Sequence, residues 1–297
     1  MSKDKVTMLY KSEEARAHVM KLVESAHAHW PDGPDGEKVE RLSVPTAAGT
    51  TAVFAFGARN SSSRPLILLH GAGSSSTMWI ADAAVLGRGR RCFAVDIPGE
   101  PGMSEERRLP WTAPAVGQWL DEVVAALGLG AKGGTAGHDL LGLSIGGWLG
   151  LAYASRGPQA LGSLALLCPS GIGHSRSSFM WKAIFAMARG HRGLENLSRS
   201  LYGNIQPPEG AISAGTLVAE STNSRMETPR LFSDAEIEFI TSPILLVVGE
   251  KDGLLRSAES AERLRSLKSK AEVHMLKGAG HALTGQGLLV ADFLDRH

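Results

Sequence analysis

The sequence of 297 residues has few of the features that stabilise or target proteins outside the cytoplasm. It contains only two cysteines, Cys92 and Cys168, and because each lies in an apolar run we expect two buried free thiols rather than a disulfide. Residues 1–11 are polar and charged, without an apolar stretch of the secretory type. No window approaches the ~20 apolar residues that span a bilayer. These absences predict a cytoplasmic protein that does not bind a membrane.

The sequence also lacks an excess of charge of either sign. It has 31 Lys and Arg against 30 Asp and Glu, a formal net charge of +1. Such a balance provides no strong field for nucleic acid or an anionic surface. The short basic run Arg88, Arg90 and Arg91 is interpreted as a solvated loop. We therefore expect no nucleic-acid partner. We also expect a small-molecule acyl substrate, and a monomer or homodimer.

Hydrophobic periodicity predicts the fold class. Two alternating runs, residues 39–44 and 51–56, flank Ala48-Gly49 and predict an antiparallel hairpin. Later apolar runs of four or five residues are typical of strands buried on both faces, and helical stretches separate them. This alternation predicts an α/β protein with a parallel sheet flanked by helices. The buried-strand runs are residues 66–69, 92–95, 140–143, 164–167 and 244–248, and the helical stretches are residues 113–127, 146–155, 258–267 and 288–296.

One long segment contains no buried-strand run, and it divides the predicted core. We interpret residues 170–241 as a helical cap inserted between residues 37–169 and 242–297, which form the core. Residues 1–36 form an N-terminal helical segment that ends in a Pro- and Gly-rich turn cluster. The alternative for the insertion is a set of ordinary packing helices.

The sequence Gly142-Leu143-Ser144-Ile145-Gly146 matches the pattern G-x-S-x-G. The pattern is informative here because it follows a buried-strand run and precedes a helix. In that setting the serine lies on a tight, strained turn that projects its hydroxyl from the sheet, and small neighbours avoid collisions across the turn. Ser144 is therefore the candidate nucleophile, and the Ile145 N–H is a candidate oxyanion donor.

A serine hydroxyl needs a base, and in this architecture an acid and then a histidine follow it along the chain. Asp252 lies in a turn just past the last strong apolar run, with Glu250 as the rival acid. His281 lies in a glycine-rich loop after the acid, and none of the other nine histidines has that position. The predicted triad is Ser144, Asp252 and His281.

A loop of small residues follows the strand predicted at residues 66–69. It contains His70, Gly71, Ala72 and Gly73, and small side chains let a backbone N–H approach a ligand closely. We assign the second oxyanion donor to Ala72, with Gly73 as the alternative. His70 is interpreted as a structural histidine that holds the loop.

These motifs together resemble the α/β-hydrolase superfamily, and residues 96–104 (Asp-Ile-Pro-Gly-Glu-Pro-Gly-Met-Ser) resemble a bacterial carboxylesterase-like branch. The resemblance covers residues 39–294. It implies the α/β-hydrolase fold, with an eight-stranded, mostly parallel sheet and a helical cap, the triad and donors named above, and no metal or organic cofactor. Glu100 and Met103 replace other residues of many relatives, a difference that affects the pocket rim.

The predicted function is hydrolysis of carboxylic esters through an acyl-enzyme. C–C bond hydrolysis or amide hydrolysis by the same triad remains an alternative, and so does a non-catalytic ligand-binding protein on this fold. Apolar side chains of the cap favour an uncharged or acyl-chain substrate, although each could belong to the core. The candidate substrate-binding residues are Gly73, Trp79, Phe179, Trp181 and Phe185.

Overall fold

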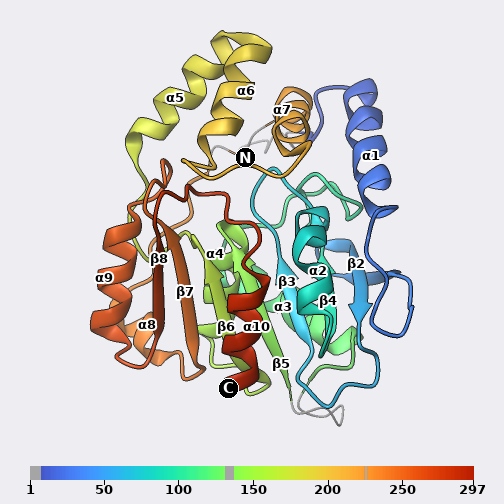
Figure 1. The fold of residues 1–297 in the computed structure, drawn as a ribbon, viewed down its shortest axis with the longest axis vertical. Coiled ribbons are helices and arrows are strands. Elements are labelled where there is room, and N and C mark those ends of the chain that lie inside the picture. Colours follow the sequence, from blue (N-terminus) through green and yellow to red (C-terminus); the bar gives the residue numbers. More distant parts are fainter. Residues whose placement is uncertain (1–7, 131–136, 224, 226) are drawn as a thin grey trace, which may run out of the picture.

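The computed structural model describes residues 8–130, 137–223, 225 and 227–297, so residues 1–7 of the predicted polar start lie outside it. One eight-stranded sheet runs through the molecule in the order β1-β2-β4-β3-β5-β6-β7-β8 (Figure 1). The predicted hairpin is confirmed, since β1 pairs antiparallel with β2, and β2 also pairs antiparallel with β4. All pairs from β4 to β8 are parallel. The fold class predicted from the sequence is confirmed.

The central strands are apolar throughout because helices cover both faces of the sheet. All residues of β3, β5 and β7 are buried. The strands are β1 (Glu40–Thr46), β2 (Gly49–Gly57), β3 (Leu66–Leu69), β4 (Arg91–Val95), β5 (His138–Leu143), β6 (Leu161–Leu167), β7 (Ile244–Gly249) and β8 (Glu272–Leu276).

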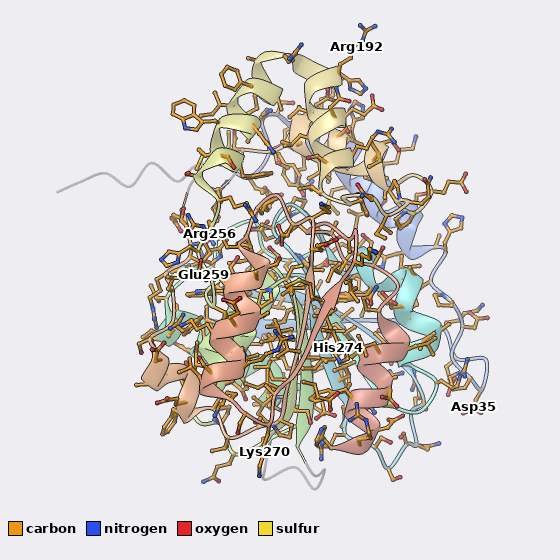
Figure 2. All side chains as sticks on the ribbon, turned by 60° about the vertical axis from the view of Figure 1, so that its left-hand side comes forward. Asp35, Arg192, Arg256, Glu259, Lys270 and His274 are labelled. Carbon is orange, nitrogen blue, oxygen red and sulfur yellow. The ribbon has the colours of Figure 1, made fainter. Side chains whose placement is uncertain are left out.

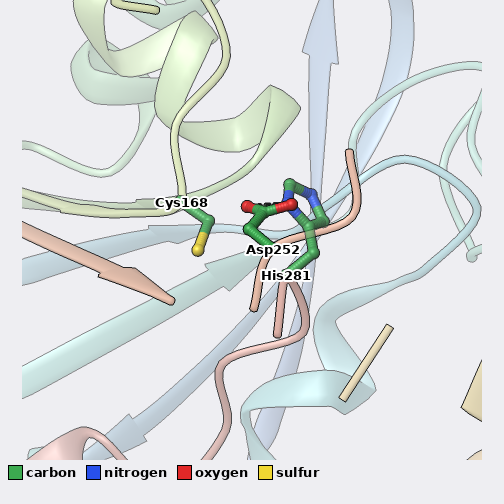
Figure 3. Close-up of side chains that lie close together, drawn as sticks. All are labelled: Cys168, Asp252 and His281. Atoms are coloured by element: carbon green, nitrogen blue, oxygen red, sulfur yellow. Dashed lines mark hydrogen bonds and ion pairs between the residues drawn. The ribbon is translucent and has the colours of Figure 1, made fainter. Parts of the chain in front are cut away.

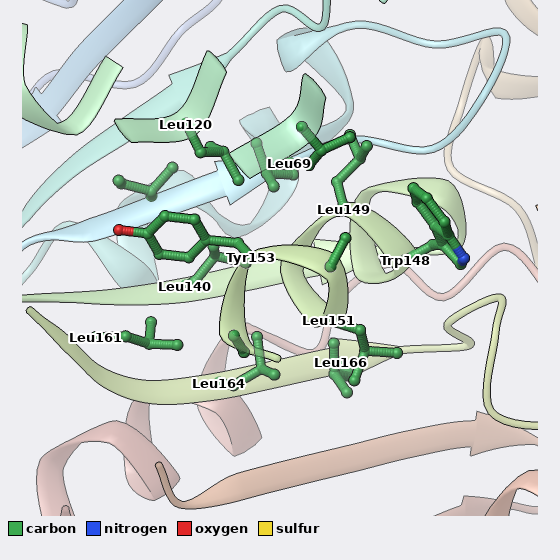
Figure 4. Close-up of a cluster of buried hydrophobic side chains, with 14 of the residues drawn as sticks. Leu69, Leu120, Leu140, Trp148, Leu149, Leu151, Tyr153, Leu161, Leu164 and Leu166 are labelled. Atoms are coloured by element: carbon green, nitrogen blue, oxygen red, sulfur yellow. The ribbon is translucent and has the colours of Figure 1, made fainter. Parts of the chain in front are cut away.

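Two apolar cores lie on opposite faces of the sheet. The larger core combines one face with α3, α4, α8 and α9, and Figure 4 shows Leu149 and Leu151 of α4 among strand leucines such as Leu140. The smaller core combines the other face with α2 and α10. These helices are α2 (Ile80–Leu86), α3 (Ala113–Ala126), α4 (Ile145–Ala154), α8 (Asp234–Phe239), α9 (Ser257–Leu267) and α10 (Gly287–Arg296), and a 3-10 helix precedes α2 (Ser76–Trp79).

The inserted segment leaves the sheet after β6 and returns at β7. Three of its helices, α5, α6 and α7, stand beyond the carboxyl end of the parallel strands, with α7 beside α1, whereas α8 packs in the larger core (Figure 1). The N-terminal segment is tied to it, because the Lys11 N–H donates to the Ser221 carbonyl over 2.9 Å. The segment boundaries predicted at residues 36, 169 and 241 stay a prediction. The helices are α1 (Glu13–His27), α5 (Ser177–Ala188), α6 (Gly190–Ser200) and α7 (Ala211–Ser221).

One expectation about charge is wrong. Arg90 does not lie in a solvated loop, because its side chain is only 4% exposed. Its guanidinium pairs with Asp139 over 3.1 Å and also with Asp295. Arg91 begins β4. The run of arginines thus leads into β4, and the ion pair with Asp139 compensates the buried charge of Arg90.

Two other expectations can be compared with the structure. Cys92 and Cys168 are buried and unpaired, as predicted. Over the described ranges, none of the helices has both the length and the apolar character needed to cross a bilayer.

Candidate active site

Ser144 occupies the sharp turn between β5 and α4. Its backbone has φ 54° and ψ −112°, a conformation that residues with a side chain rarely adopt. The turn requires small neighbours: a Cβ on Gly142 would lie 2.4 Å from the Gly146 carbonyl oxygen, and one on Gly146 would lie 2.2 Å from the Leu69 carbonyl oxygen. The side chain of Ser144 is therefore held at the carboxyl edge of the sheet, half-buried.

A chain of hydrogen bonds links Ser144 to His281 and Asp252. The Ser144 Oγ lies 2.8 Å from His281 Nε2, and His281 Nδ1 lies 2.8 Å from Asp252 Oδ2. Both histidine and acid are buried, and Figure 3 shows the two side chains against each other. This is the geometry of a nucleophile, a base and an acid that orients the base.

The environment of Asp252 favours its ionised form. Burial by itself would raise the pKa of Asp252, but the adjacent His281 and two backbone donors outweigh burial and lower it. The donors are the N–H groups of Leu254 and Leu255, at 2.8 and 3.0 Å from Oδ1. Its rival Glu250 is exposed and accepts from the Gly278 N–H over 2.9 Å.

The loop that carries His281 is held from both sides. Buried Asp82, on α2, accepts from the N–H groups of Gly285 and Gly287 over 3.1 and 2.8 Å. On the other side, the Ala282 N–H donates to the Leu201 carbonyl of the inserted segment over 2.9 Å. Sequence reasoning missed Asp82, because an aspartate in a short helix gives no signal of a partner about 200 residues away along the chain.

The loop after β3 supplies the second group of backbone donors. His70 is buried and spans the loop, since its Nδ1 lies 2.8 Å from the Gly71 carbonyl and its Nε2 accepts from the Ile97 N–H over 2.9 Å. Burial lowers the pKa of His70, so it is held neutral. Its interpretation as a structural histidine agrees with these contacts.

The two preferred oxyanion donors and the alternative differ in their contacts. Among the residues that the structure describes, the N–H groups of Ala72 and Ile145 have no hydrogen-bond acceptor. The Gly73 N–H, by contrast, donates to Glu100 Oε2 over 2.8 Å. The geometry thus leaves Ala72 and Ile145 available for a ligand, while Gly73 is occupied by a side chain that the sequence reasoning had placed only at the pocket rim.

The other predicted substrate-binding residues are dispersed. Trp79 is 1% exposed and belongs to the smaller core, whereas Trp181 and Phe185 on α5 are 62% and 65% exposed. Phe179 is half-buried on the same helix. A cavity of about 200 Å³ is lined by Ala72 and Gly73, but by none of these four aromatic residues. Their assignment to the pocket stays a prediction.

Cys168 lies next to the hydrogen-bonded pair (Figure 3). Its Sγ, a carboxylate oxygen of Asp252 and a ring nitrogen of His281 lie within 4.8 Å of one another, which is compatible with metal ligation. Burial, with the adjacent Asp252, raises the pKa of the Cys168 thiol well above its ordinary value. A metal there would need a thiolate and would displace the bond between His281 and Asp252, so these residues fit a serine site better than a metal site.

Comparison with known proteins identifies the family. A model of the Alpha/beta hydrolase family matches residues 66–293. The chain belongs to the alpha/beta hydrolase family. This hydrolase is 29% identical over 253 residues to carboxylesterase YbfK of Bacillus subtilis (strain 168), covering 82% of each chain.

A solved structure of naproxen esterase (carboxylesterase NP) from Bacillus subtilis superposes on this hydrolase with a TM-score of 0.81. It is 26% identical, and the match covers 96% of this chain and 99% of that one. Esterase Rv0045c of Mycobacterium tuberculosis is 24% identical over 289 residues, covering 88% and 89% of the two chains. The resemblance to a bacterial carboxylesterase-like branch is confirmed, and the protein is a carboxylesterase-like hydrolase.

Proposed function

We propose that this hydrolase cleaves carboxylic esters through an acyl-enzyme on Ser144, with His281 as general base and Asp252 as its orienting acid. The observation that carries the proposal is the continuous chain of two 2.8 Å hydrogen bonds from the Ser144 hydroxyl to the Asp252 carboxylate. Such a chain activates an otherwise weak nucleophile, and acid–base assistance of this kind typically contributes about 10²–10⁴-fold. Its likeness to named carboxylesterases supports the ester as the substrate class.

The first half-reaction forms the acyl-enzyme. His281 Nε2 takes the hydroxyl proton as Ser144 Oγ bonds to the ester carbonyl carbon, and negative charge develops on the carbonyl oxygen. The unpaired N–H groups of Ala72 and Ile145 stabilise that oxyanion, and the N-terminus of α4 adds its positive dipole end. The bond to the alcohol oxygen then breaks, and His281 returns the proton to the departing alcohol.

The second half-reaction returns the free enzyme. His281 takes a proton from water as the water oxygen attacks the acyl carbon. Collapse of the second tetrahedral intermediate breaks the bond to Ser144 Oγ, which recovers its proton from His281, and the carboxylic acid leaves. The low pKa of Asp252 suits this role because an ionised carboxylate stabilises the imidazolium in both half-reactions.

The Ser144→Ala variant tests the proposal. With a series of 4-nitrophenyl esters, we expect kcat to fall about 10⁴-fold or more, because a nucleophile acting with its base is lost as a unit. Full activity of the alanine variant would show that Ser144 is not the nucleophile. Mass spectrometry of the wild-type enzyme, quenched during turnover, should find the acyl group on the peptide containing Ser144.

A broader panel separates esters from the other reactions that a triad can perform. Matched amides and C–C substrates should be turned over far more slowly than the esters. If wild-type protein bound these ligands tightly but turned over none of them, the ligand-binding alternative would replace the enzymatic one.

A further inference from the structure

The cavity beside the oxyanion loop is rich in charge. Besides Ala72 and Gly73, its lining includes Glu100, Arg108 and Arg225. Pockets that bind small molecules use a few fixed polar groups to determine which substrate is accepted. Two guanidinium groups at the wall of a cavity that Ala72, one of the two candidate oxyanion donors, also lines are candidates for that role.

A hydrogen bond and ring stacking hold the side chain of Arg225 in place, but one of its donors has no partner among the described residues. Its Nη2 donates to the Leu109 carbonyl over 2.6 Å, and the guanidinium stacks 4.2 Å from the centre of the Trp111 ring. Only 8% of the side chain is exposed, and its buried Nε has no hydrogen-bond partner within the described part of the chain. The carboxylate of Glu227 lies 3.8 Å from that Nε and is itself 66% exposed, which makes it a weak and solvated counter-charge.

Arg108 is held in the same manner. One of its Nη groups donates to the Asn223 carbonyl, and its buried Nε also has no hydrogen-bond partner among residues placed by the structure. Backbone carbonyls therefore orient both guanidiniums without neutralising them. An unpaired buried donor is unfavourable, and more so when it is charged, so a ligand of opposite charge at these guanidiniums would be stabilised.

Glu100 can offset at most one of the two arginine charges. Its carboxylate accepts from the Gly73 N–H, and across the described residues it forms no ion pair with Arg108 or Arg225. Burial raises the pKa of Glu100, although both arginines oppose that shift. The cavity thus has two cationic groups and at most one negative charge, beside the position where the ester carbonyl would bind.

We propose that Arg108 and Arg225 form an anion-binding subsite for a second, carboxylate group of the substrate, so that the enzyme prefers half-esters of dicarboxylic acids. The proposal rests on the proposed function, because it is the oxyanion loop that relates the cavity to the scissile carbonyl. Guanidinium groups suit a carboxylate since their planar donors match its two oxygens. This preference differs from the uncharged substrate expected from the apolar residues of the cap.

Matched substrates test the subsite. The 4-nitrophenyl half-esters of adipic and pimelic acid carry a free carboxylate, and the corresponding primary amides have the same shape without the charge. We expect kcat/KM to be at least tenfold higher for each half-ester than for its amide. We expect Arg225→Gln and Arg108→Gln each to lower that ratio about tenfold, the scale of one lost charged hydrogen bond.

Two further variants control for folding and for general charge. The ratio compares two substrates on the same enzyme, so partial unfolding of a variant cancels, and Arg225→Lys should recover part of the preference because it restores the charge without the fork. Arg192 is exposed at the outer end of the inserted helices (Figure 2), and Arg192→Gln should leave both rates unchanged.

The outcomes separate this proposal from the one it rests on. Suppose that the half-esters and their primary-amide analogues both react through Ser144, and that neither Arg225→Gln nor Arg108→Gln changes the ratio of their kcat/KM values. The proposed subsite is then wrong, and the proposed triad is unaffected. If Ser144→Ala keeps full activity, the proposed function is wrong. Inorganic phosphate at constant ionic strength tests a free anion: inhibition that depends on Arg225, without any preference for half-esters, would overturn the assignment to substrate.

Discussion

A buried histidine and a buried aspartate lie at each end of strand β5, but the two pairs of side chains differ in their contacts. At the carboxyl end, Ser144 meets His281, whose ring is hydrogen-bonded to Asp252. At the amino end, His138 and Asp139 are neighbours in sequence, yet alternation along the strand turns their side chains to opposite faces of the sheet. Among the described residues, no chain of hydrogen bonds joins a serine hydroxyl, a histidine and a carboxylate at this end.

The contacts at the amino end are structural. Asp139 accepts from Arg64 over 2.9 Å, from Arg90 over 3.1 Å and from the Ser163 N–H over 2.8 Å. His138 has no hydrogen-bond partner at either ring nitrogen among the described residues, and burial lowers its pKa to about 4. The comparison shows that burial and a shifted pKa occur at structural positions as well as at active sites. What distinguishes the carboxyl end is the geometry between groups and the half-buried, accessible Ser144.

The largest expected effect is on kcat, and it distinguishes Asp252 from its rival Glu250 as the acid at the carboxyl end. Asp252→Asn should lower kcat about 10⁴-fold, because the amide no longer stabilises the imidazolium or sets its tautomer. Glu250→Gln is the matched control and should change kcat less than tenfold, since within the described structure the Glu250 carboxylate accepts from the Gly278 N–H and not from His281. Steady-state kinetics with one 4-nitrophenyl ester measures both; equal losses would contradict the assignment of Asp252.

A smaller effect, on stability rather than turnover, is expected at the amino end. Asp139→Asn removes the buried one of the two carboxylates that compensate Arg90, and we expect a loss of about 3–5 kcal/mol in the free energy of unfolding, with kcat per folded molecule unchanged. The control is Asp121→Asn, which breaks an exposed pair with Arg156 and should cost at most about 1 kcal/mol. Urea denaturation compares them, and a fall in kcat without a loss of stability would show that Asp139 acts in the reaction.

The smallest expected effect is the contribution of His138 to the pH dependence of the free energy of unfolding. The unfolded chain takes up a proton at this residue near pH 6.5, and the folded chain does so only near pH 4. The contribution of neutral His138 is therefore fully present above pH 6.5 and is lost as pH falls toward 4, by about 3 kcal/mol. Urea denaturation at pH 7.5 and 4 should show His138→Leu losing about that much less stability than wild type. Parallel losses in the two proteins would show that His138 titrates normally.

Predictions from the sequence succeeded where a feature depends on nearby residues. The turn at Ser144 was predicted because Gly142 and Gly146 lie two residues away, and the structure shows the backbone contacts that exclude any side chain there. Arg90 was misread because its partners Asp139 and Asp295 are 49 and 205 positions away along the chain. No local pattern distinguishes an arginine that enters a buried ion pair from one that is solvated.

The α/β alternation, the strained turn at Ser144 and the order of Ser144, Asp252 and His281 along the chain could all be predicted from the residues alone. These follow from hydrophobic periodicity and turn chemistry, which act over a few residues. Only the tertiary structure brought Ser144 to His281 across 137 positions, and it alone placed Glu100, Arg108 and Arg225 around one cavity. Such placements depend on how separate strand ends and loops meet at the edge of the sheet, because packing decides the distances between them.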